Sequence, residues 1–333
     1  MAMRHLLRGQ RQRSSGDPAR AIGHIRRRAV WSTSGVPTPP EPRFGLFLSQ
    51  ANRAWPELLD EFTLAEELGF DHAWLVDHLV DTDGPPVHPC HEAWTLLAAI
   101  AARTARIRLG ILVTSNTFRH PALLLKQAVT VDHVSGGRLI LGLGAGWHED
   151  EHRRFGIPLP PPAERVDRFA EAVELIEELM ATGRATFHGR FYRLDDARLE
   201  PRPLQRPRIP LLIAAHRPRM IGIAARHADQ WDTFPVLAGA ATEGVVDDVA
   251  ARVARFDTAC RAAGRDPLLV RRSTWVGAGA TSSTEAFSAF VERHRALGFT
   301  DFSVTRPDPQ NWDVVRAIAR DVLPGLRAAA SQP

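Results

Sequence analysis

A run of three glycines at alternate positions, in RLILGLGAGWHEDEHRRFGIP (138–158), is the first candidate for ligand chemistry. A dinucleotide-binding loop has the spacing G-x-G-x-x-G on the first strand of its unit, and a helix follows it directly. Here the spacing is G-x-G-x-G, the strand is the fourth along the chain, and Trp147 follows Gly146. The pattern therefore excludes a Rossmann phosphate loop. Such glycines can instead let a flat ligand approach the end of a strand, or simply turn the chain.

Asp77 and His78 follow another apolar run, AWLV, and have side chains suited to acid–base chemistry. The charge of a histidine changes near neutral pH, so it can give or take a proton beside a reacting group. The alternative is a histidine that lines the fold and hydrogen-bonds to the backbone. We predict His78 as the catalytic residue.

The segment HPCHE, with His88, Cys90 and His91, contains side chains that bind zinc. A zinc site usually needs a third and fourth ligand, and hydrolases with a metal in a barrel carry H-x-H on the first strand. This chain has Leu48-Ser49-Gln50 there. We therefore predict no metal site and expect HPCHE to line the substrate pocket.

Predicted strands and helices alternate regularly from Arg43 onward. Helices are predicted where apolar residues recur every three to four positions, and strands where short apolar runs lie between turn residues. Strands are expected within 43–49, 71–78, 107–115, 138–158, 209–215, 229–235, 268–279 and 299–305. Helices are expected near 55–69, 91–105, 120–137, 162–183, 217–228, 243–263, 284–297 and 311–329. The segment 185–194 alternates around a His-Gly turn and predicts a hairpin inserted after the fourth helix. Eight strand–helix pairs predict an α/β fold, a single (β/α)8 TIM barrel over 43–330.

Charge is distributed unevenly along the 333 residues. Residues 1–42 hold eight arginines and two acids, a net charge of +6, whereas the whole chain carries +4, so residues 43–333 carry −2. Only one of the 42 basic residues is a lysine, Lys126. The near-neutral barrel argues against a nucleic-acid partner. No apolar run approaches the roughly 18 residues of a membrane span, and two cysteines, Cys90 and Cys260, favour a reducing cytoplasm.

Residues 1–42 are predicted to form a basic, disordered extension. They contain no long apolar core, so they do not have the pattern of a secretory signal. Their arginine and serine content with few acids is also typical of an organelle transit peptide, and that alternative stays open. The proline-rich VPTPPEP (36–42) indicates a stiff linker into the first strand.

Three ordered segments resemble the bacterial luciferase-like monooxygenase superfamily, especially its branch that uses the deazaflavin coenzyme F420. They are 112–138, 135–176 and 209–234, and the similarity extends over about 43–326. The resemblance implies an oxidoreductase that transfers a hydride between the reduced deazaflavin and a small organic substrate. Two alternatives remain open: an FMN-dependent monooxygenase that uses O2, and a flavin-binding relative without enzymatic activity. The resemblance also implies a homodimer.

The same resemblance implies a cofactor at the carboxyl ends of strands two to five. His78 is expected near the ring carbon that exchanges hydride, with Asp77 contacting the ring or orienting the histidine. A non-proline cis peptide is expected near Leu112–Val113, with Thr114 and Ser115 beside the ring edge. The other expected cofactor contacts are Gly144, Ala145, Gly146 and Trp147 after strand four, and Ala214, Ala215, His216 and Arg217 in the phosphate loop after strand five.

The chain departs from the family pattern in two places. Relatives often carry glycines in the phosphate loop at 214–217, where this chain offers the charge of Arg217 instead. Relatives that oxidise sugar phosphates carry a Trp shortly after the His and a Glu directly after the strand-four glycines. Residues 79–84 contain no Trp, and Trp147 occupies the Glu position. We therefore do not expect sugar-phosphate dehydrogenase activity.

Removal of residues 1–42 should leave the barrel unchanged, because their composition cannot bury enough apolar area to offset the entropy of ordering them. A chain that starts at Arg43 is expected to match the full chain in Tm and in cofactor Kd, measured by calorimetry and by fluorescence titration. A Tm lower by several degrees would show that this segment stabilises the barrel.

Overall fold

The computed structural model describes residues 40–82, 84–85, 87–235 and 249–329. One compact unit spans Pro39–Pro333 and contains every helix and strand named below. The predicted extension lies almost entirely outside the described residues, as do residues 243–248 of the predicted sixth helix.

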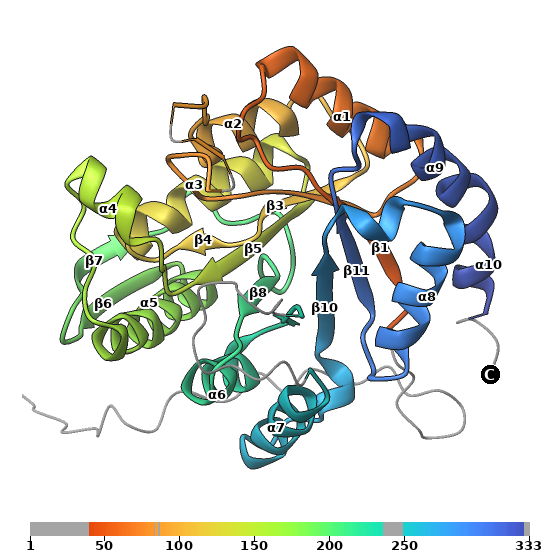
Figure 1. Cartoon of the computed structure of the whole chain (residues 1–333). Coiled ribbons are helices and arrows are strands. Elements are labelled where there is room, and N and C mark those ends of the chain that lie inside the picture. The colour runs from red at the N-terminus through yellow and green to blue at the C-terminus, as the bar shows by residue number, and fades with distance from the viewer. Residues whose placement is uncertain (1–39, 83, 86, 236–248, 330–333) are drawn as a thin grey trace, which may run out of the picture. The chain divides into compact units, whose positions relative to one another are not determined.

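Parallel strands close into a barrel, as predicted (Figure 1). Each strand pairs with its neighbours in the order β3-β2-β1-β11-β10-β9-β8-β5-β4, and an additional β3–β5 pairing closes the circle. Strands β3 and β4 are two parts of the third predicted strand, and both pair with β5. The strands are β1 (Arg43–Phe47), β2 (His72–Leu75), β3 (Arg108–Ile111), β4 (Thr114–Ser115), β5 (Leu139–Gly144), β8 (Leu211–Ala214), β9 (Gln230–Asp232), β10 (Arg271–Val276) and β11 (Asp301–Thr305).

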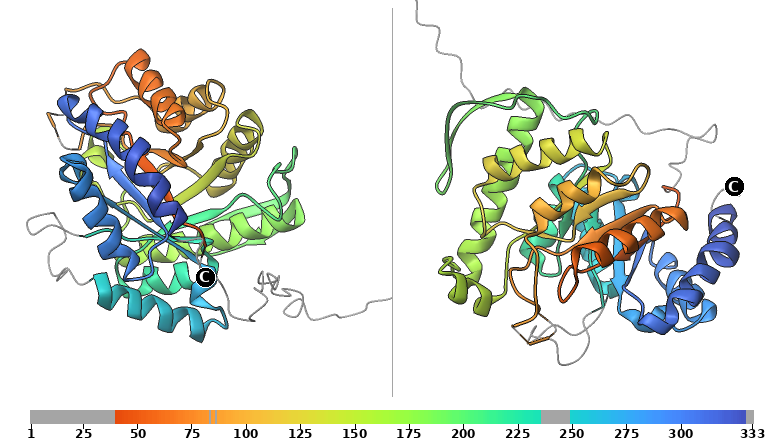
Figure 2. Two further views of the ribbon diagram at one scale, coloured as in Figure 1. Left: turned by 90° about the vertical axis from the view of Figure 1, so that its right-hand side faces the viewer. Right: turned by 90° about the horizontal axis from the view of Figure 1, so that it is seen from above.

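Helices follow the strands and cover the outside of the barrel (Figure 1). They are α1 (Trp55–Glu67), α2 (Ala93–Ala101), α3 (Pro121–Val134), α5 (Pro162–Thr182), α6 (Pro218–His227), α7 (Val249–Ala262), α8 (Thr284–Arg295), α9 (Trp312–Ala317) and α10 (Leu323–Ala328). The predicted closing helix is divided into α9 and α10 by a π-helical turn at Ile318–Val322. The predicted hairpin is also present, as the antiparallel strands β6 (Arg184–His188) and β7 (Arg193–Arg198), and it lies beside α5 (Figure 2).

One short helix, α4 (Glu149–Phe155), was not expected from the sequence. Its first turn holds three acids and its last turn three basic residues, which suits the helix dipole. The side chain of His148 caps it by accepting a hydrogen bond from the Glu151 amide, and Gly156 ends it at a φ of 66°. With only seven residues, α4 is too short to show an apolar period, so periodicity could not predict it.

Alternation along the strands divides the core into two layers. In β1, Phe44 packs outward on Phe287 of α8, whereas Phe47 contacts the barrel interior. That interior is filled by four buried side chains, Trp74, Leu112, Ile140 and Leu212. Because they close the centre of the barrel, a ligand can bind only at an end of it. In barrels of this kind that is the carboxyl end of the strands.

An acid also lies inside the barrel. Asp232 of β9 is 1% exposed, and the Ser273 hydroxyl donates a hydrogen bond to its Oδ2 atom at 2.7 Å. Within the described ranges its Oδ1 atom has no hydrogen-bond partner. Burial raises the pKa of Asp232 to about 7, against the effect of the Ser273 bond and with a smaller contribution from the charge of Asp301. The folded protein therefore binds this proton more tightly than an unfolded chain does.

This raised pKa makes stability depend on pH with a defined sign. Between about pH 4 and pH 7 the unfolded chain has released the Asp232 proton and the folded protein has not, so the unfolding free energy falls as pH rises. In Asp232→Asn this loss is absent. From pH 5 to pH 7 the variant should gain about 2–3 kcal/mol relative to the natural protein, at 1.36 kcal/mol per pH unit.

Urea unfolding at pH 5, 6, 7 and 8 measures this difference. Asp321→Asn serves as the control, because Asp321 lies on the surface in an ion pair with Arg320. A difference between Asp232→Asn and the natural protein that stays constant over this range would contradict the assignment.

Candidate active site

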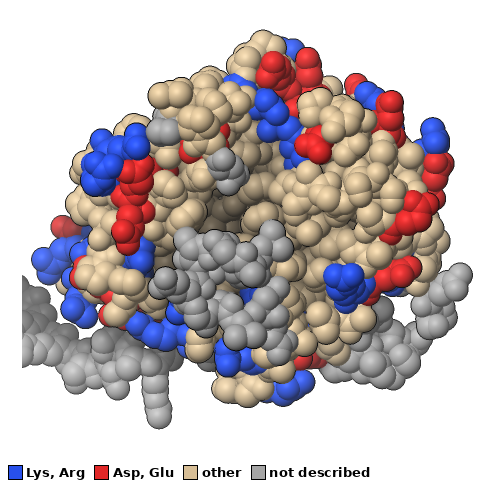
Figure 3. Space-filling model, viewed as in Figure 1, with Lys and Arg blue, Asp and Glu red and all other residues tan. Residues whose placement is uncertain are grey.

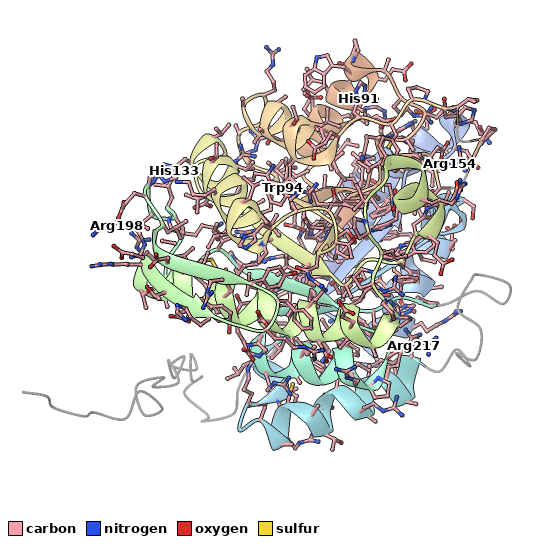
Figure 4. All side chains as sticks on the ribbon, turned by 90° about the vertical axis from the view of Figure 1, so that its left-hand side faces the viewer. His91, Trp94, His133, Arg154, Arg198 and Arg217 are labelled. Carbon is pink, nitrogen blue, oxygen red and sulfur yellow. The ribbon has the colours of Figure 1, made fainter. Side chains whose placement is uncertain are left out.

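The carboxyl ends of the barrel strands meet on one face, which is hollowed near its centre (Figure 3). Arg217, which follows β8, and Arg154 of α4 both lie on this side, whereas His133 and Arg198 lie on the opposite side (Figure 4). Most of the residues predicted to act on a ligand follow the ends of strands on this face. We call the hollow at its centre the barrel mouth.

His78 is held at the mouth by a buried carboxylate. Its Nδ1 atom lies 3.0 Å from Oε1 of Glu151, and the Leu79 amide donates to Oε2 of the same carboxylate at 3.0 Å. Burial of Glu151 acts to raise its pKa, but the hydrogen bonds from His78 and Leu79 and the nearby histidine charges lower it overall. Glu151 is therefore ionised at neutral pH and can only accept, so Nδ1 carries the proton of the neutral ring.

The other ring nitrogen of His78, Nε2, has no hydrogen-bond partner in the part of the chain that the structure describes. The side chain is 18% exposed, and Trp147 and His148 meet its ring edge-on with centroid distances of 5.7 and 5.8 Å. Buried Gln50 fixes the chain just before the site, since its amide donates to the Val76 carbonyl and accepts from the Val76 amide. The geometry leaves Nε2 available for a ligand in the mouth.

The sequence suggested that Asp77 could orient the His78 ring, but the Asp77 carboxylate is bound by Arg119 and Ser115. Arg119 binds both of its carboxylate oxygens, at 2.6 and 3.0 Å, and the Ser115 amide donates to Oδ2 at 2.8 Å. Asp77 is only 4% exposed; burial raises its pKa, and the Arg119 guanidinium opposes this. The carboxylate that hydrogen-bonds His78 is Glu151, so the expectation that Asp77 orients the histidine is corrected. Asp77 instead joins the end of β2 to the end of β4.

The segment after β3 has the predicted backbone. The Leu112–Val113 peptide bond is cis, and Val113 is partly exposed and packs on the interior cluster of Trp74, Leu112, Ile140 and Leu212. Thr114 and Ser115 form β4 and are buried. The Ser115 hydroxyl bonds Thr117 at 2.7 Å, and the Thr117 hydroxyl contacts Nε2 of His152 at 2.7 Å.

Two glycines at and just after the end of β5 make room for residues 113–117. A Cβ atom on Gly144 would lie 2.5 Å from Cγ2 of Val113, and one on Gly146 would lie 2.7 Å from the hydroxyls of Ser115 and Thr117. Gly146 also has a φ of 84°, which side chains disfavour. The space left by the missing side chains is therefore filled by residues 113–117. Ala145 and Gly146 are partly exposed, and Trp147 is 57% exposed at the mouth.

The residues at the end of β8 lie next to the end of β5, because the two strands pair. Ala214 is partly buried, and buried Ala215 accepts a hydrogen bond from the Trp231 indole. The ring of His216 hydrogen-bonds Arg252 and Thr233. Arg217 precedes the first turn of α6 and is exposed, with no ion pair to any residue in the described ranges. It is the predicted residue best placed to meet an anionic group.

The HPCHE segment also lies near His78. The Cys90 thiol donates to the His78 carbonyl at 3.3 Å, and His88 bonds Asp81 at 2.8 Å. Burial raises the pKa of Cys90 to about 11, with neighbouring acids adding to it, so this thiol stays protonated. Among the described residues no group of three or more His, Cys, Asp and Glu side chains is arranged to hold a metal ion.

The structure brings together the predicted residues at the ends of β2, β4 and β5, and those at the end of β8 lie beside them, because β8 pairs with β5. Sequence reasoning missed Glu151, Arg119, Thr117 and His152. A signal for Glu151 was present: three acids, three basic residues and Gly156 in a row are typical of a short capped helix. Nothing in the sequence pairs Arg119 with Asp77, which lies 42 residues away.

The residues of the mouth fit a flat cofactor with an anionic tail. Val113 offers a partly exposed apolar platform, and a side chain at Gly144 would displace it. Arg165 donates to the Gly146 carbonyl at 3.1 Å, and Arg217 stands at the start of α6, so positive charge flanks the mouth on the side of α5 and α6. Helix N-termini and arginine forks are suited to phosphate groups.

Comparison with known proteins gives consistent matches. A family model described as luciferase-like monooxygenase matches residues 41–313. An F420-dependent glucose-6-phosphate dehydrogenase of Nakamurella multipartita is 37% identical over 198 residues, which are 59% of this chain and only 57% of the relative. An F420-dependent hydroxymycolic acid dehydrogenase of Mycobacterium tuberculosis is 31% identical over 290 residues, 84% of this chain and 74% of the relative.

A solved structure extends the likeness of fold. An F420-dependent secondary alcohol dehydrogenase, in complex with an F420-acetone adduct, superposes with a TM-score of 0.72 at 20% identity. The superposition covers 86% of this chain and 99% of that one. At this identity it supports the barrel fold alone.

Proposed function

The chain belongs to the luciferase-like monooxygenase family, and we propose that it is an F420-dependent oxidoreductase acting on a small organic substrate. The observation that carries the proposal is the His78–Glu151 pair at the same mouth as the Val113 platform; the Nε2 atom of His78 has no hydrogen-bond partner among the described residues. The F420-dependent relatives support the choice of cofactor. The chain spans 57% of the length of the first of these relatives, so the activity and substrate of this chain are proposals.

The cofactor would lie across Val113 and along the strand ends. In this proposal Ala145, Gly146 and Trp147 flank the ring, the buried Thr114 and Ser115 lie behind its edge, and Arg217 binds the phosphate of the tail. Ala214 ends β8, and Ala215 and His216 connect the strand to this arginine. When bound, a deazaflavin supplies or accepts a hydride at a ring carbon, as a two-electron carrier that reacts poorly with oxygen.

The protein's own part is to position the reactants and to move one proton. Glu151 fixes the His78 ring through Nδ1, so Nε2 gives a proton to a substrate oxygen on reduction or takes one on oxidation. A positioned acid or base of this kind typically contributes a factor of about 10²–10⁴. The Glu151 carboxylate lies 3.0 Å from Nδ1, beside the ring that becomes positively charged when Nε2 takes a proton. Arg119 and Asp77 keep the ends of β2 and β4 in register around the site.

We further propose that the protein works as a homodimer in the cytoplasm, without nucleic-acid or membrane partners. Both cysteines are free thiols, and the net charge of residues 43–333 is close to zero. Of the helices that the structure describes, none has the length and apolar character needed to cross a bilayer. Sedimentation of the purified full chain tests the dimer.

The protein should bind F420 more tightly than FMN. Titration of each cofactor, followed by quenching of tryptophan fluorescence, gives the two Kd values, and Trp147 near the proposed ring makes the signal sensitive. Tighter binding of FMN, together with oxygen consumption during turnover, would instead favour the flavin-dependent monooxygenase. Binding of either cofactor without any turnover would favour a non-enzymatic flavin carrier.

His78→Ala should lower turnover by about two to four orders of magnitude, the range of lost acid–base catalysis. Cofactor affinity should change by less than about tenfold, because one ring-edge contact is worth about 1 kcal/mol. Glu151→Gln should lower turnover by about 10- to 100-fold, since a hydrogen bond to a charged group contributes about 1.5–3 kcal/mol. Single-turnover rates at saturating cofactor separate these effects from binding.

Glu149→Gln is the matched control, because Glu149 is exposed on the same helix two residues before Glu151. It should retain the natural rate. If cofactor affinity collapses in His78→Ala while turnover of the saturated enzyme survives, His78 is a binding residue and the proton comes from elsewhere.

A further inference from the structure

Aromatic rings form a continuous wall along one half of the barrel mouth. Phe47 at the end of β1 stacks on Trp275 of β10, with ring centroids 5.1 Å apart and an angle of 5° between the planes. Trp275 contacts Phe234, which follows β9, at 4.3 Å, and Phe234 meets His216 edge-on at 4.4 Å. Phe47, Trp275 and Phe234 are all partly exposed. We call Phe47, Trp275 and Phe234 the aromatic wall.

The aromatic wall and the proposed cofactor platform share one floor. Phe47 and Trp275 pack on the interior cluster of Trp74, Leu112, Ile140 and Leu212, and Val113 packs on the same four residues. Val113 comes from the third strand of the barrel, whereas the wall comes from β1, β9 and β10 on the other side of the circle. A ligand in the mouth therefore lies between Val113 on one side and aromatic rings on the other.

Polar groups border the aromatic wall at both of its ends, and the guanidinium of Arg306, beside Phe47, bonds the Ser49 carbonyl. At the other end of the wall, the His216 ring hydrogen-bonds Thr233 and Arg252. His78 follows β2, Ser115 ends β4, and Glu151 lies on α4, away from the strands that carry the wall. A sugar needs several hydrogen bonds around its ring, whereas a planar apolar ligand needs matching faces and one or two polar contacts. The arrangement provides flat faces, with the His78 Nε2 atom as a polar contact.

From this arrangement we infer that the substrate is a planar aromatic carbonyl compound, stacked on Trp275 and Phe47, with its oxygen toward His78. The inference rests on the proposed function, because it places the cofactor on the Val113 side of the same mouth. Aromatic faces prefer to stack on one another at centroid distances of about 4.5–7 Å, and such pairs gain free energy beyond the area they bury. Trp275 is thus the residue that determines specificity.

Two ketones of nearly equal size test the inference. Acetophenone and cyclohexyl methyl ketone carry the same acetyl group, and only the first has a flat aromatic ring. Their Kd values are measured by calorimetry on protein saturated with oxidised F420 and on protein without it, so that no turnover is needed. The natural protein saturated with F420 should bind acetophenone about 3- to 10-fold more tightly, the gain expected for one aromatic pair.

Trp275→Leu should bring the ratio of the two Kd values to about one, and Phe47→Leu should reduce it. Phe290→Leu is the control, because Phe290 is a buried ring of α8 in the helix layer and should leave the ratio unchanged. The two variants of the wall provide independent tests should one of them fold poorly, which thermal unfolding reports. Equal binding of both ketones by the natural protein, or a preference that survives in both variants of the wall, would overturn the inference.

Failure of the proposed function gives a different result. If the natural protein does not bind F420 in the fluorescence titration, the proposed cofactor is wrong, and the titration without F420 then decides the inference: a preference for acetophenone that Trp275→Leu removes supports the aromatic substrate class, and equal binding rejects it. If F420 binds and His78→Ala loses turnover, yet the two ketones bind equally, the proposed function stands and only the aromatic substrate class is rejected.

Discussion

Close packing of residues 112–117 against Gly144, at the end of β5, and Gly146, two residues later, holds the site together. Gly144 and Gly146 have no side chains, so Val113, Ser115 and Thr117 occupy the space beside the fourth strand. Interiors are packed so densely that even one added methyl group must be accommodated by a shift. The position of Val113 at the mouth, and of the Ser115 amide at the Asp77 carboxylate, both follow from this contact.

The hydrogen-bond donors around three buried carboxyl groups differ, and so do the roles of the three groups. Asp77 is bound by Arg119 and the Ser115 amide and serves as a structural link. Glu151 accepts hydrogen bonds from the Leu79 amide and His78, which keeps it ionised and makes it an orienting group. Asp232 has only the Ser273 hydroxyl as a hydrogen-bond donor among the described residues, so burial dominates and favours its protonated form. Burial dominates and raises the pKa of Asp77 and of Asp232, whereas the hydrogen bonds and charges around Glu151 outweigh burial and lower its pKa.

The proposed acid–base pair and the aromatic rings come from different parts of the mouth, and this division connects fold to proposed chemistry. His78 and Val113 follow β2 and β3 and Glu151 lies on α4, while the ends of β1, β9 and β10 bring flat rings. A closed parallel barrel makes such a division possible, since all its strand ends face the same space and each contributes its own side chains. One barrel fold can therefore serve different substrates when the side chains at some of its strand ends change and those at the others stay.

The sequence alone determined the barrel and the positions of its strand ends, because each long helix carries a hydrophobic period and each strand is a short apolar run between turn residues. The family resemblance located the cis peptide at Leu112–Val113 and proposed His78 as the proton carrier. Only the tertiary structure decided which carboxylate holds that histidine. Glu151 lies 73 residues from His78, on a helix of seven residues with no period to reveal it. The neighbouring Asp77 is turned away to Arg119, 42 residues along the chain. The aromatic wall is likewise assembled from separate strands. Hydrophobic periods in a sequence describe residues that are neighbours along the chain, whereas closure of the barrel brings together side chains from strands that are far apart in the sequence.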